Sequence, residues 1–347
     1  KNIGHGPIVM SELYADYRQR LRAAIEKLRR LRPGVKCLIY LDTWLVSGES
    51  LLEQWGDSIW RRKDGLPQQH TFSETWNAHI ALVTPTLSNS VGRALLEGIP
   101  TCYLEEIGAD GLYWDEMSRA FGGSGWVSGL ADYAHPDGYT FEIDPATGRI
   151  VAECGAPELA SLPFKLALLR AFEARGATVV ANTTPTTLTE TRERFVRFNE
   201  TSIPHHPGTI YKSWTYTPVA YAGYSVYHTP GVTEEMFLAD IRDKLWHANL
   251  YLFSAPMFYH LFTHENLATY EYPITPVELD WGVIIGRERI ITMRSGRFGW
   301  PGERWSGEVI YFDGEQRVRE RKAVTAEADG YVDVSFARGE AAVVVRH

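Results

Sequence analysis

The sequence predicts an α/β protein, with a (β/α)₈ barrel of the TIM type over residues 1–272 and an antiparallel β-sandwich over residues 273–347. Three observations support this prediction. Strand-like and helix-like segments alternate up to about residue 250, which is typical of parallel strands joined by helical crossovers. Several of the apolar strand segments end on Asp, Asn or Glu. Beyond about Pro273, helical patterns stop and short β-type runs follow one another between Gly, Asp and Arg turns.

The chain opens on its clearest helix. Apolar residues recur at spacings of three and four from Met10 to Leu31, and Pro33-Gly34 ends the pattern. An apolar strand from Val35 to Asp42 follows. A second strand is predicted from Ala78 to Val83, before a helical stretch from about Ser90 to Glu106.

The most informative segment runs from Gly108 to Glu116. A short apolar run follows a glycine-bounded turn and stops on two adjacent carboxylates, Asp115 and Glu116. Burying an unpaired carboxylate costs several kcal/mol or more, so a charge on the last residue of a buried strand should face a polar cleft. In parallel α/β proteins that cleft lies at the carboxyl ends of the strands, and catalysis is usually sited there.

The segments after Asp115 continue the alternation. An insertion rich in Gly and polar residues, Ser118 to Cys154, precedes a helix from Leu159 to Arg175, and we expect it to fold over the strand ends as a lid. A strand from Ala177 then ends on Asn182, and Thr187 to Glu190 has the form of a capping box.

The remaining predicted barrel elements are a strand from Arg194 to Phe198, which stops at Asn199-Glu200, a strand from Tyr211 to Tyr216, a helix from Glu234 to Ala248 and a strand from Leu250 to Phe253.

The strand count is seven, one short of a closed barrel, and because the chain opens on a helix the missing strand should be the first. We expect a segment upstream of Lys1, from the same gene product or a separate chain, to supply it. Asn2 to Val9 suits a strand less well because it contains Gly4, Gly6 and Pro7. On this numbering Asp42 ends strand 2, Asp115 strand 4, Asn182 strand 5 and Glu200 strand 6.

Bulk properties exclude several classes of function. The net charge of −8 argues against a nucleic-acid partner, because phosphate binding needs a concentrated basic surface. No apolar segment is long enough to span a bilayer, so we expect a soluble protein, cytoplasmic or secreted. No G-x-G-x-x-G motif follows a strand, and the three cysteines lack C-x-x-C spacing, so no dinucleotide, zinc or other cofactor is predicted.

A barrel whose fourth strand closes in D-G-x-Y-x-D-E, followed by a β-sandwich, resembles retaining glycoside hydrolases, broadly of the α-galactosidase and α-glucosidase type. The resemblance implies that a strand-4 carboxylate is the nucleophile and a strand-6 carboxylate the acid/base. Asp115 and Glu200 occupy those places. The usual acid/base of these enzymes is Asp, whereas this chain has Glu.

Glycosidic bond cleavage needs two carboxyl groups on opposite sides of the anomeric carbon, one to protonate the departing oxygen and one to attack the carbon or to activate water. We take Asp115 as the nucleophile and Glu200 as the proton donor. Glu116 stays an alternative, because adjacent strand residues point to opposite sides and only one member of the doublet can face the cleft. The residues that we expect to bind the sugar by hydrogen bonds or stacking, with no metal, are Asp42, Trp44, Trp114, Asn182, His205, Trp214 and Tyr216.

Two further functions remain open. An inverting hydrolase or a transglycosidase could use the same architecture, and a non-catalytic carbohydrate-binding protein could keep the fold without the reaction.

Overall fold

A computed structural model describes residues 6–48, 50–70, 73, 79–118, 121–122, 125–126, 131–182, 187–201, 220–224, 233–246, 250–251 and 263–347. The chain forms two compact parts, Lys1–Val196 and Arg197–His347. This division lies well before the predicted boundary at residues 272 and 273. The change in sequence pattern near Pro273 coincides instead with the first antiparallel strand, β13 (Pro276–Asp280).

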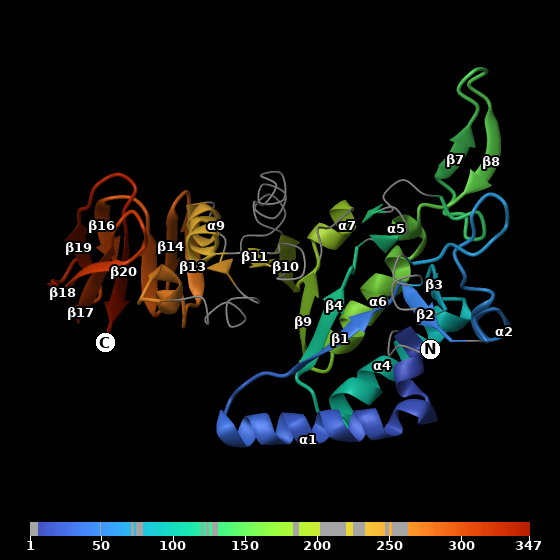
Figure 1. Ribbon diagram of the computed structural model, residues 1–347, viewed down its shortest axis with the longest axis horizontal. Helices are drawn as coiled ribbons and strands as arrows, with labels where there is room; N and C mark the ends of the chain where they lie inside the picture. The colour runs from blue at the N-terminus through green and yellow to red at the C-terminus, as the bar shows by residue number, and fades with distance from the viewer. Residues whose placement is uncertain are drawn as a thin grey trace. The chain divides into compact units, whose positions relative to one another are not determined.

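Three parallel strands form the centre of the first part: β1 (Leu38–Asp42), β4 (Gly111–Asp115) and β9 (Thr178–Asn182). All three were predicted from their apolar sequences. Three helices cover one face of this sheet, namely α1 (Ala15–Leu31), α4 (Ser90–Thr101) and α6 (Leu162–Glu173) (Figure 1). The first part is therefore a mixed α/β structure with a helix-covered face and an opposite face.

Residue alternation assigns side chains to the two faces of the sheet. Leu41, Trp114 and Ala181 lie in one core cluster with apolar residues of the three helices, and at most 2% of each is exposed. Their neighbours in sequence point the other way, because successive strand residues alternate between faces. The polar residue that ends each strand consequently lies on the face opposite the helices.

The predicted strand Ala78 to Val83 exists in part but was assigned wrongly. The strand described within it, β3 (Ile80–Leu82), pairs antiparallel with β2 (Leu45–Ser47), outside the parallel sheet. β1 pairs directly with β4, so no strand lies between them and the predicted numbering from strand 2 to strand 4 fails. The error has a physical reason: a short buried apolar run does not reveal the direction of the strand it will pair with.

The start of the chain differs from the predicted helix. Two short 3₁₀ helices, η1 (Gly6–Met10) and η2 (Glu12–Tyr14), precede α1, so the α-helix begins at Ala15 rather than Met10. Asn2 to Val9 does not form a strand where it is described, and residues 2–5 lie outside the described chain. Among the described residues, β1 is paired on one side only.

Short elements make the connections of the first part. In chain order they are α2 (Leu51–Trp55), a π-helical turn η3 (Cys102–Glu106), β5 (Phe121–Gly122), β6 (Gly125–Trp126), β7 (Thr140–Ile143), β8 (Ile150–Cys154), α5 (Pro157–Ala160) and α7 (Leu188–Thr191). The predicted capping box is confirmed at α7, where the Thr187 hydroxyl accepts from the Glu190 amide and the Glu190 carboxylate accepts from the Thr187 amide.

The second part begins with a parallel run of β10 (Val196–Thr201), β11 (Ala220–Tyr224) and β12 (Leu250–Tyr251). The helix α9 (Glu234–Trp246) precedes β12. The predicted strand Tyr211 to Tyr216 lies outside the described residues. Because the described chain shows parallel runs of three strands within each part, it does not show a closed eight-stranded barrel.

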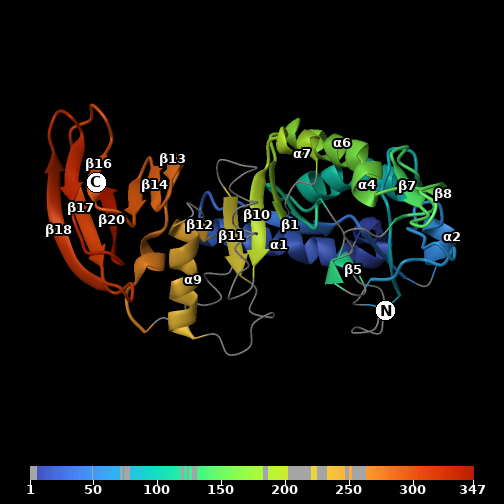
Figure 2. The same ribbon diagram turned by 90° about the horizontal axis from the view of Figure 1, so that it is seen from above.

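An antiparallel sheet of six strands makes up most of the second part, in the order β13-β14-β15-β20-β17-β18. A two-stranded sheet of β16 and β19 accompanies it (Figure 2). The bounds of these strands after β13 are β14 Val283–Gly286, β15 Arg289–Thr292, β16 Gly296–Gly299, β17 Trp305–Phe312, β18 Val318–Ala326, β19 Tyr331–Val334 and β20 Ala341–Arg346.

Both faces of the six-stranded sheet are buried. Val309 and Tyr311 belong to a core cluster shared with β16 and β19, whereas Ile310 and Phe312 belong to a cluster shared with α9 and the 3₁₀ helix η6 (Leu267–Tyr270). This two-sided burial explains the continuous apolar run of β20. The result is a sandwich-like arrangement, in agreement with the predicted change of fold after Pro273.

One ion pair is fully buried in the first part. The Lys165 Nζ of α6 lies 2.5 Å from Glu190 Oε1, and the side chains are 1% and 0% exposed. Removing one partner of such a pair leaves an uncompensated buried charge, which typically costs about 3–5 kcal/mol.

We predict that Lys165→Met lowers the free energy of unfolding by about 3–5 kcal/mol in urea titrations, and that Lys165→Met/Glu190→Gln recovers most of this loss. The control is Arg20→Met, which breaks the exposed pair with Asp16 and should cost less than about 1 kcal/mol. Equal effects of Lys165→Met and Arg20→Met would contradict the burial of the Lys165–Glu190 pair.

Candidate functional site

The candidate site is a row of three polar side chains at the carboxyl ends of the parallel strands. Asp42 of β1 is in register with Asp115 of β4, and Asp115 with Asn182 of β9. All three lie on the sheet face opposite α1, α4 and α6. We call Asp42, Asp115 and Asn182 the strand-end row. The sequence predicted each of the three as a site residue, and the structure brings them together.

Among the described residues, three donors hold the carboxyl group of Asp115. The Tyr40 hydroxyl donates to Oδ2 at 2.8 Å, the Asn182 amide donates to Oδ1 at 2.8 Å, and the Glu116 backbone N–H donates to Oδ1 at 3.1 Å. Hydrogen bonds to a carboxylate stabilise its charged form and fix its orientation. Asp115 is therefore a carboxyl group held in a fixed orientation.

Asp42 has a different environment, although it lies beside Asp115 in the row. Its side chain is 2% exposed, and the Trp44 backbone N–H donates to its Oδ1 at 2.8 Å. Burial and, next, the negative charge of Asp115 raise the pKa of Asp42 well above its usual range. Burial and the neighbouring carboxylate thus favour the protonated form of Asp42 over its ionised form.

Glu116 follows the strand in an unusual backbone conformation. Its φ is 50°, in the left-handed region that non-glycine residues adopt at a cost of about 1–3 kcal/mol. The Trp44 Nε1–H donates to the Glu116 carbonyl at 2.6 Å, which helps to hold this turn. Trp44 therefore contacts both carboxylate-bearing segments, through its backbone to Asp42 and through its indole to Glu116.

Two tryptophans predicted to contact sugar lie in the interior instead. Trp114 is 0% exposed, faces the helices against Phe164 and donates to the Thr43 hydroxyl. Trp44 is 1% exposed and packs with Trp60 in a small core cluster. Neither indole presents a face to a ligand, because both are packed against other core side chains.

Two aromatic residues beside the strand-end row were not among the predicted site residues. Tyr40 and Tyr113 stack with ring centroids 6.0 Å apart, and each lies two residues before an aspartate of the row. Residues two apart on a strand share a face, so the period of two from Asp42 and Asp115 could have identified both rings.

Several predicted site residues lie outside the described chain. These are His205, Trp214 and Tyr216. Glu200 belongs by its backbone to β10, where it is in register with Gly223, but its side chain is among those that are not described. The pairing of Asp115 with Glu200 stays a prediction.

The insertion after β4 forms a hairpin of β7 and β8, which rises on the same side as the carboxyl ends of β1, β4 and β9 (Figure 1). Two of its residues that could face a sugar are used internally. Tyr133 donates to Glu142, and the ring nitrogens of His135 contact Asp132 Oδ2 at 2.5 Å and the Asp57 carbonyl at 2.8 Å. Tyr139, which is 83% exposed, remains available.

Within the described residues, no group of three or more His, Cys, Asp or Glu side chains could hold a metal ion. In the same part of the chain, no helix is long and apolar enough to cross a membrane.

No protein-family model matches this chain, and no curated protein matches it in sequence. Among solved structures, the chain is similar to a cycloisomaltooligosaccharide glucanotransferase of Paenibacillus sp., crystallised with cycloisomaltoheptaose. The two share 8% sequence identity with a TM-score of 0.38. The match covers 95% of this chain and 45% of that protein, so the chain spans less than half of the length of its structural neighbour.

The raised pKa of Asp42 leads to a prediction about how the free energy of unfolding depends on pH. Because its pKa is raised in the folded state, the contribution of Asp42 to stability is fully present below its usual pKa of 3.8 and is lost as pH rises towards the folded value. Asp42→Asn keeps the acceptor for Trp44 and cannot ionise. We predict that it is more stable than the unsubstituted protein at about pH 7, with a difference that grows from about pH 4 upwards in thermal unfolding.

The control for this experiment is Asp110→Asn. Burial acts to raise the pKa of Asp110, but hydrogen bonds from the Cys37 amide and Arg29 outweigh it and lower the pKa. Its stabilising contribution is present above the usual pKa of an aspartate and is lost as pH falls, so Asp110→Asn should destabilise the protein at neutral pH. If Asp42→Asn also destabilised the protein there, the raised pKa of Asp42 would be contradicted.

Proposed function

We propose that the chain is a carbohydrate-active enzyme that cleaves a glycosidic bond by a retaining double displacement, with Asp115 as nucleophile and Glu200 as acid/base. The observation that carries the proposal is the hydrogen bonding of Asp115. A carboxyl group that accepts from Tyr40, Asn182 and the Glu116 amide at the carboxyl end of a parallel strand, on the face opposite α1, α4 and α6, has the fixed orientation that a nucleophile needs.

The chemistry assigns one role to each residue. Asp115 Oδ attacks the anomeric carbon and forms a glycosyl ester, while the carboxylic acid of Glu200 gives its proton to the departing oxygen as the glycosidic bond breaks. The Glu200 carboxylate then takes a proton from a water molecule, whose oxygen displaces Asp115 and releases the sugar. If an acceptor sugar replaces water in the second step, the same residues perform a transglycosylation.

The residues around Asp115 fit supporting roles. Asn182 and Tyr40 hold the nucleophile, and Asp42 lies in register beside it on β1. The stacked rings of Tyr40 and Tyr113 lie on the same face and can contact the C–H face of a sugar ring. Glu116, held in a strained turn by Trp44, is the alternative to Asp115 for the catalytic carboxylate.

The proposal includes a closed (β/α)₈ barrel as the scaffold. It requires a further strand beside the second edge of β1. The parallel β1-β4-β9 sheet with helices on one face supports this arrangement, because it is the geometry of part of such a barrel.

We predict that Asp115→Asn and Glu200→Gln each lower kcat on activated aryl glycosides by about 10²–10⁴-fold without changing the thermal unfolding midpoint by more than a few degrees. Glu116→Gln is the matched variant in the doublet and should retain most of the activity. A panel of aryl α- and β-glycosides supplies the substrate, and NMR of the first product distinguishes retention from inversion.

Azide separates the roles of the two carboxylates. Added azide should restore turnover in both Asp115→Ala and Glu200→Ala. The products should be glycosyl azides, with opposite anomeric configurations in the two variants. Full activity of Asp115→Asn with loss in Glu116→Gln would move the nucleophile to Glu116. Saccharide binding without turnover by the unsubstituted protein would instead indicate a non-catalytic carbohydrate-binding protein.

A further inference from the structure

A groove runs along one side of α9 in the second part of the chain, away from the strand-end row in sequence. Its volume is about 1160 Å³. One wall is the face of α9 that carries Glu235, Ala239, Arg242 and Trp246, at helical spacings of four, three and four. The other wall is formed by the turns after β17 and β19 and by Met293. We call this the α9 groove. Since α9 has 13 residues, the groove is roughly 20 Å long.

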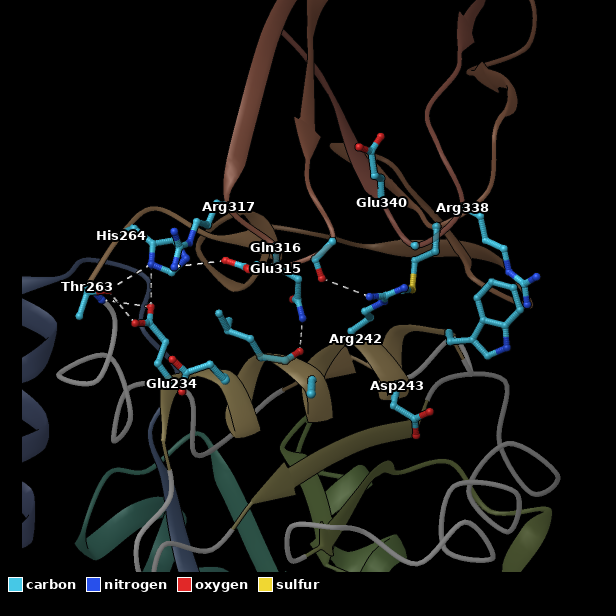
Figure 3. A pocket seen from close by; sticks show the side chains of 17 residues that line it. Glu234, Arg242, Asp243, Thr263, His264, Glu315, Gln316, Arg317, Arg338 and Glu340 are labelled. Carbon is cyan, nitrogen blue, oxygen red and sulfur yellow. Dashed lines mark hydrogen bonds and ion pairs between the residues drawn. The ribbon is translucent and has the colours of Figure 1, made fainter.

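The two ends of the α9 groove differ in charge. Glu234, Thr263, His264 and Arg317 lie towards one end, whereas Arg242, Asp243 and Arg338 lie towards the other (Figure 3). At the first end the charges are paired, with His264 Nδ1 3.1 Å from Glu234 and Arg317 3.3 Å from Glu315. Both ends of the groove therefore carry acidic and basic groups.

The second end contains two guanidinium groups that are not neutralised by carboxylates in the described chain. Arg242 donates to the Gly314 carbonyl at 3.3 Å. Among the described residues, no carboxylate lies within ion-pair distance of Arg338. Both groups have N–H donors left for a ligand, because a guanidinium group carries five.

Trp246 provides a rigid aromatic surface at this end. Its indole lies directly against the backbone of Gly282, where an added Cβ would be 2.8 Å from Cε3, and the Trp246 carbonyl accepts from the Gly282 N–H at 2.7 Å. The side chain is nevertheless 41% exposed, whereas Trp300 and Trp305 of the same part are 6% and 7% exposed. An indole that is fixed on one side and open on the other is suited to stacking with a flat ligand.

We propose that the α9 groove is a second, non-catalytic binding site for a saccharide chain, with one sugar ring stacked on Trp246 and its hydroxyl groups hydrogen-bonded to Arg242 and Arg338. Hydroxyl groups both donate and accept hydrogen bonds, so they match a groove that is lined by both guanidinium donors and carboxylate acceptors. The length of the groove admits several linked rings, and its aromatic end admits the apolar C–H face of one of them.

The charge of the groove disfavours a polyphosphate or nucleic-acid ligand. Glu234, Glu235, Asp243, Glu315 and Glu340 line it together with three arginines, so a polyanion would meet more carboxylates than guanidinium groups. Saccharides are either neutral or carry at most about one carboxylate per ring, and the two unneutralised arginines can accommodate either form.

Affinity electrophoresis in gels that contain soluble polysaccharides tests the proposal. The probes are neutral glucans, galactomannan and xylan, with polygalacturonate as the acidic arm, and inorganic polyphosphate serves as the polyanion comparison. We expect retardation by at least one polysaccharide. Trp246→Ala and Arg338→Ala should each weaken binding by about tenfold, the effect of losing one good stacking or charge-assisted contact. Trp246→Phe should retain part of the binding.

The matched control is Tyr17→Ala, which removes an aromatic residue of α1 that is 41% exposed, like Trp246, and should leave retardation unchanged. Arg338→Ala keeps the test valid if Trp246→Ala fails to fold, because Arg338 has no ion-pair partner in the described chain. Retardation by polygalacturonate alone, abolished in Arg338→Ala, would identify the ligand as an acidic saccharide.

The proposal of a saccharide-binding groove and the proposal of a catalytic site can be tested independently of each other. Asp115→Asn should still be retarded by the polysaccharide, and Trp246→Ala should hydrolyse small aryl glycosides at the rate of the unsubstituted protein. Three outcomes would overturn the proposal. The first is that no polysaccharide retards the protein, and the second is that Trp246→Ala and Arg338→Ala are retarded as strongly as the unsubstituted protein. The third is that only polyphosphate retards it.

Discussion

The division of the β1-β4-β9 sheet into an apolar face and a polar-ended face is the constraint on which the first part of the chain depends. Trp114 and Asp115 are adjacent, yet the pleat sends the indole into the helix-packed core and the carboxylate to the opposite side. Burial of Trp114 among α6 side chains anchors the register of β4 between its two neighbours. A shift of one residue would put the carboxylate into an apolar core, so the packing of one residue fixes the position of the other.

Trp44 and Lys165 extend this constraint from the sheet to the turns above it. Trp44 joins Asp42 to the Glu116 turn, and the Lys165 ammonium group lies 5.9 Å from the centroid of the Trp44 ring. Lys165 is in turn paired with Glu190, which also caps α7. A continuous set of buried contacts thus connects α6 and α7 to the carboxylate turns at the ends of β1 and β4. The turns are therefore held in place by Trp44, Lys165 and Glu190, which are themselves buried.

The sequence was most informative where local pattern and tertiary context agree. The strands ending at Asp42, Asp115 and Asn182, the capping box at Thr187 and the change to β structure after Pro273 all depend on short-range signals, and the structure contains them. The Ala78–Val83 segment shows the limit of such signals, because its apolar run does not encode a pairing direction. Trp44 and Trp114 show a second limit, because the sequence does not tell whether an indole next to an acidic residue faces the core or a ligand. The apolar core partners that decide this lie far away in sequence, on α6 and around Trp60.

The single paired edge of β1 has a consequence for any attempt to divide the protein. In the described chain no strand is bound to the other edge of β1, yet Ile39, Leu41 and Asp42 are only 8%, 2% and 2% exposed. An unpaired strand edge is a template for pairing with any extended peptide that reaches it, including the same segment of another molecule. A fragment in which the packing over Leu38–Asp42 was loosened would uncover this template and would tend to aggregate.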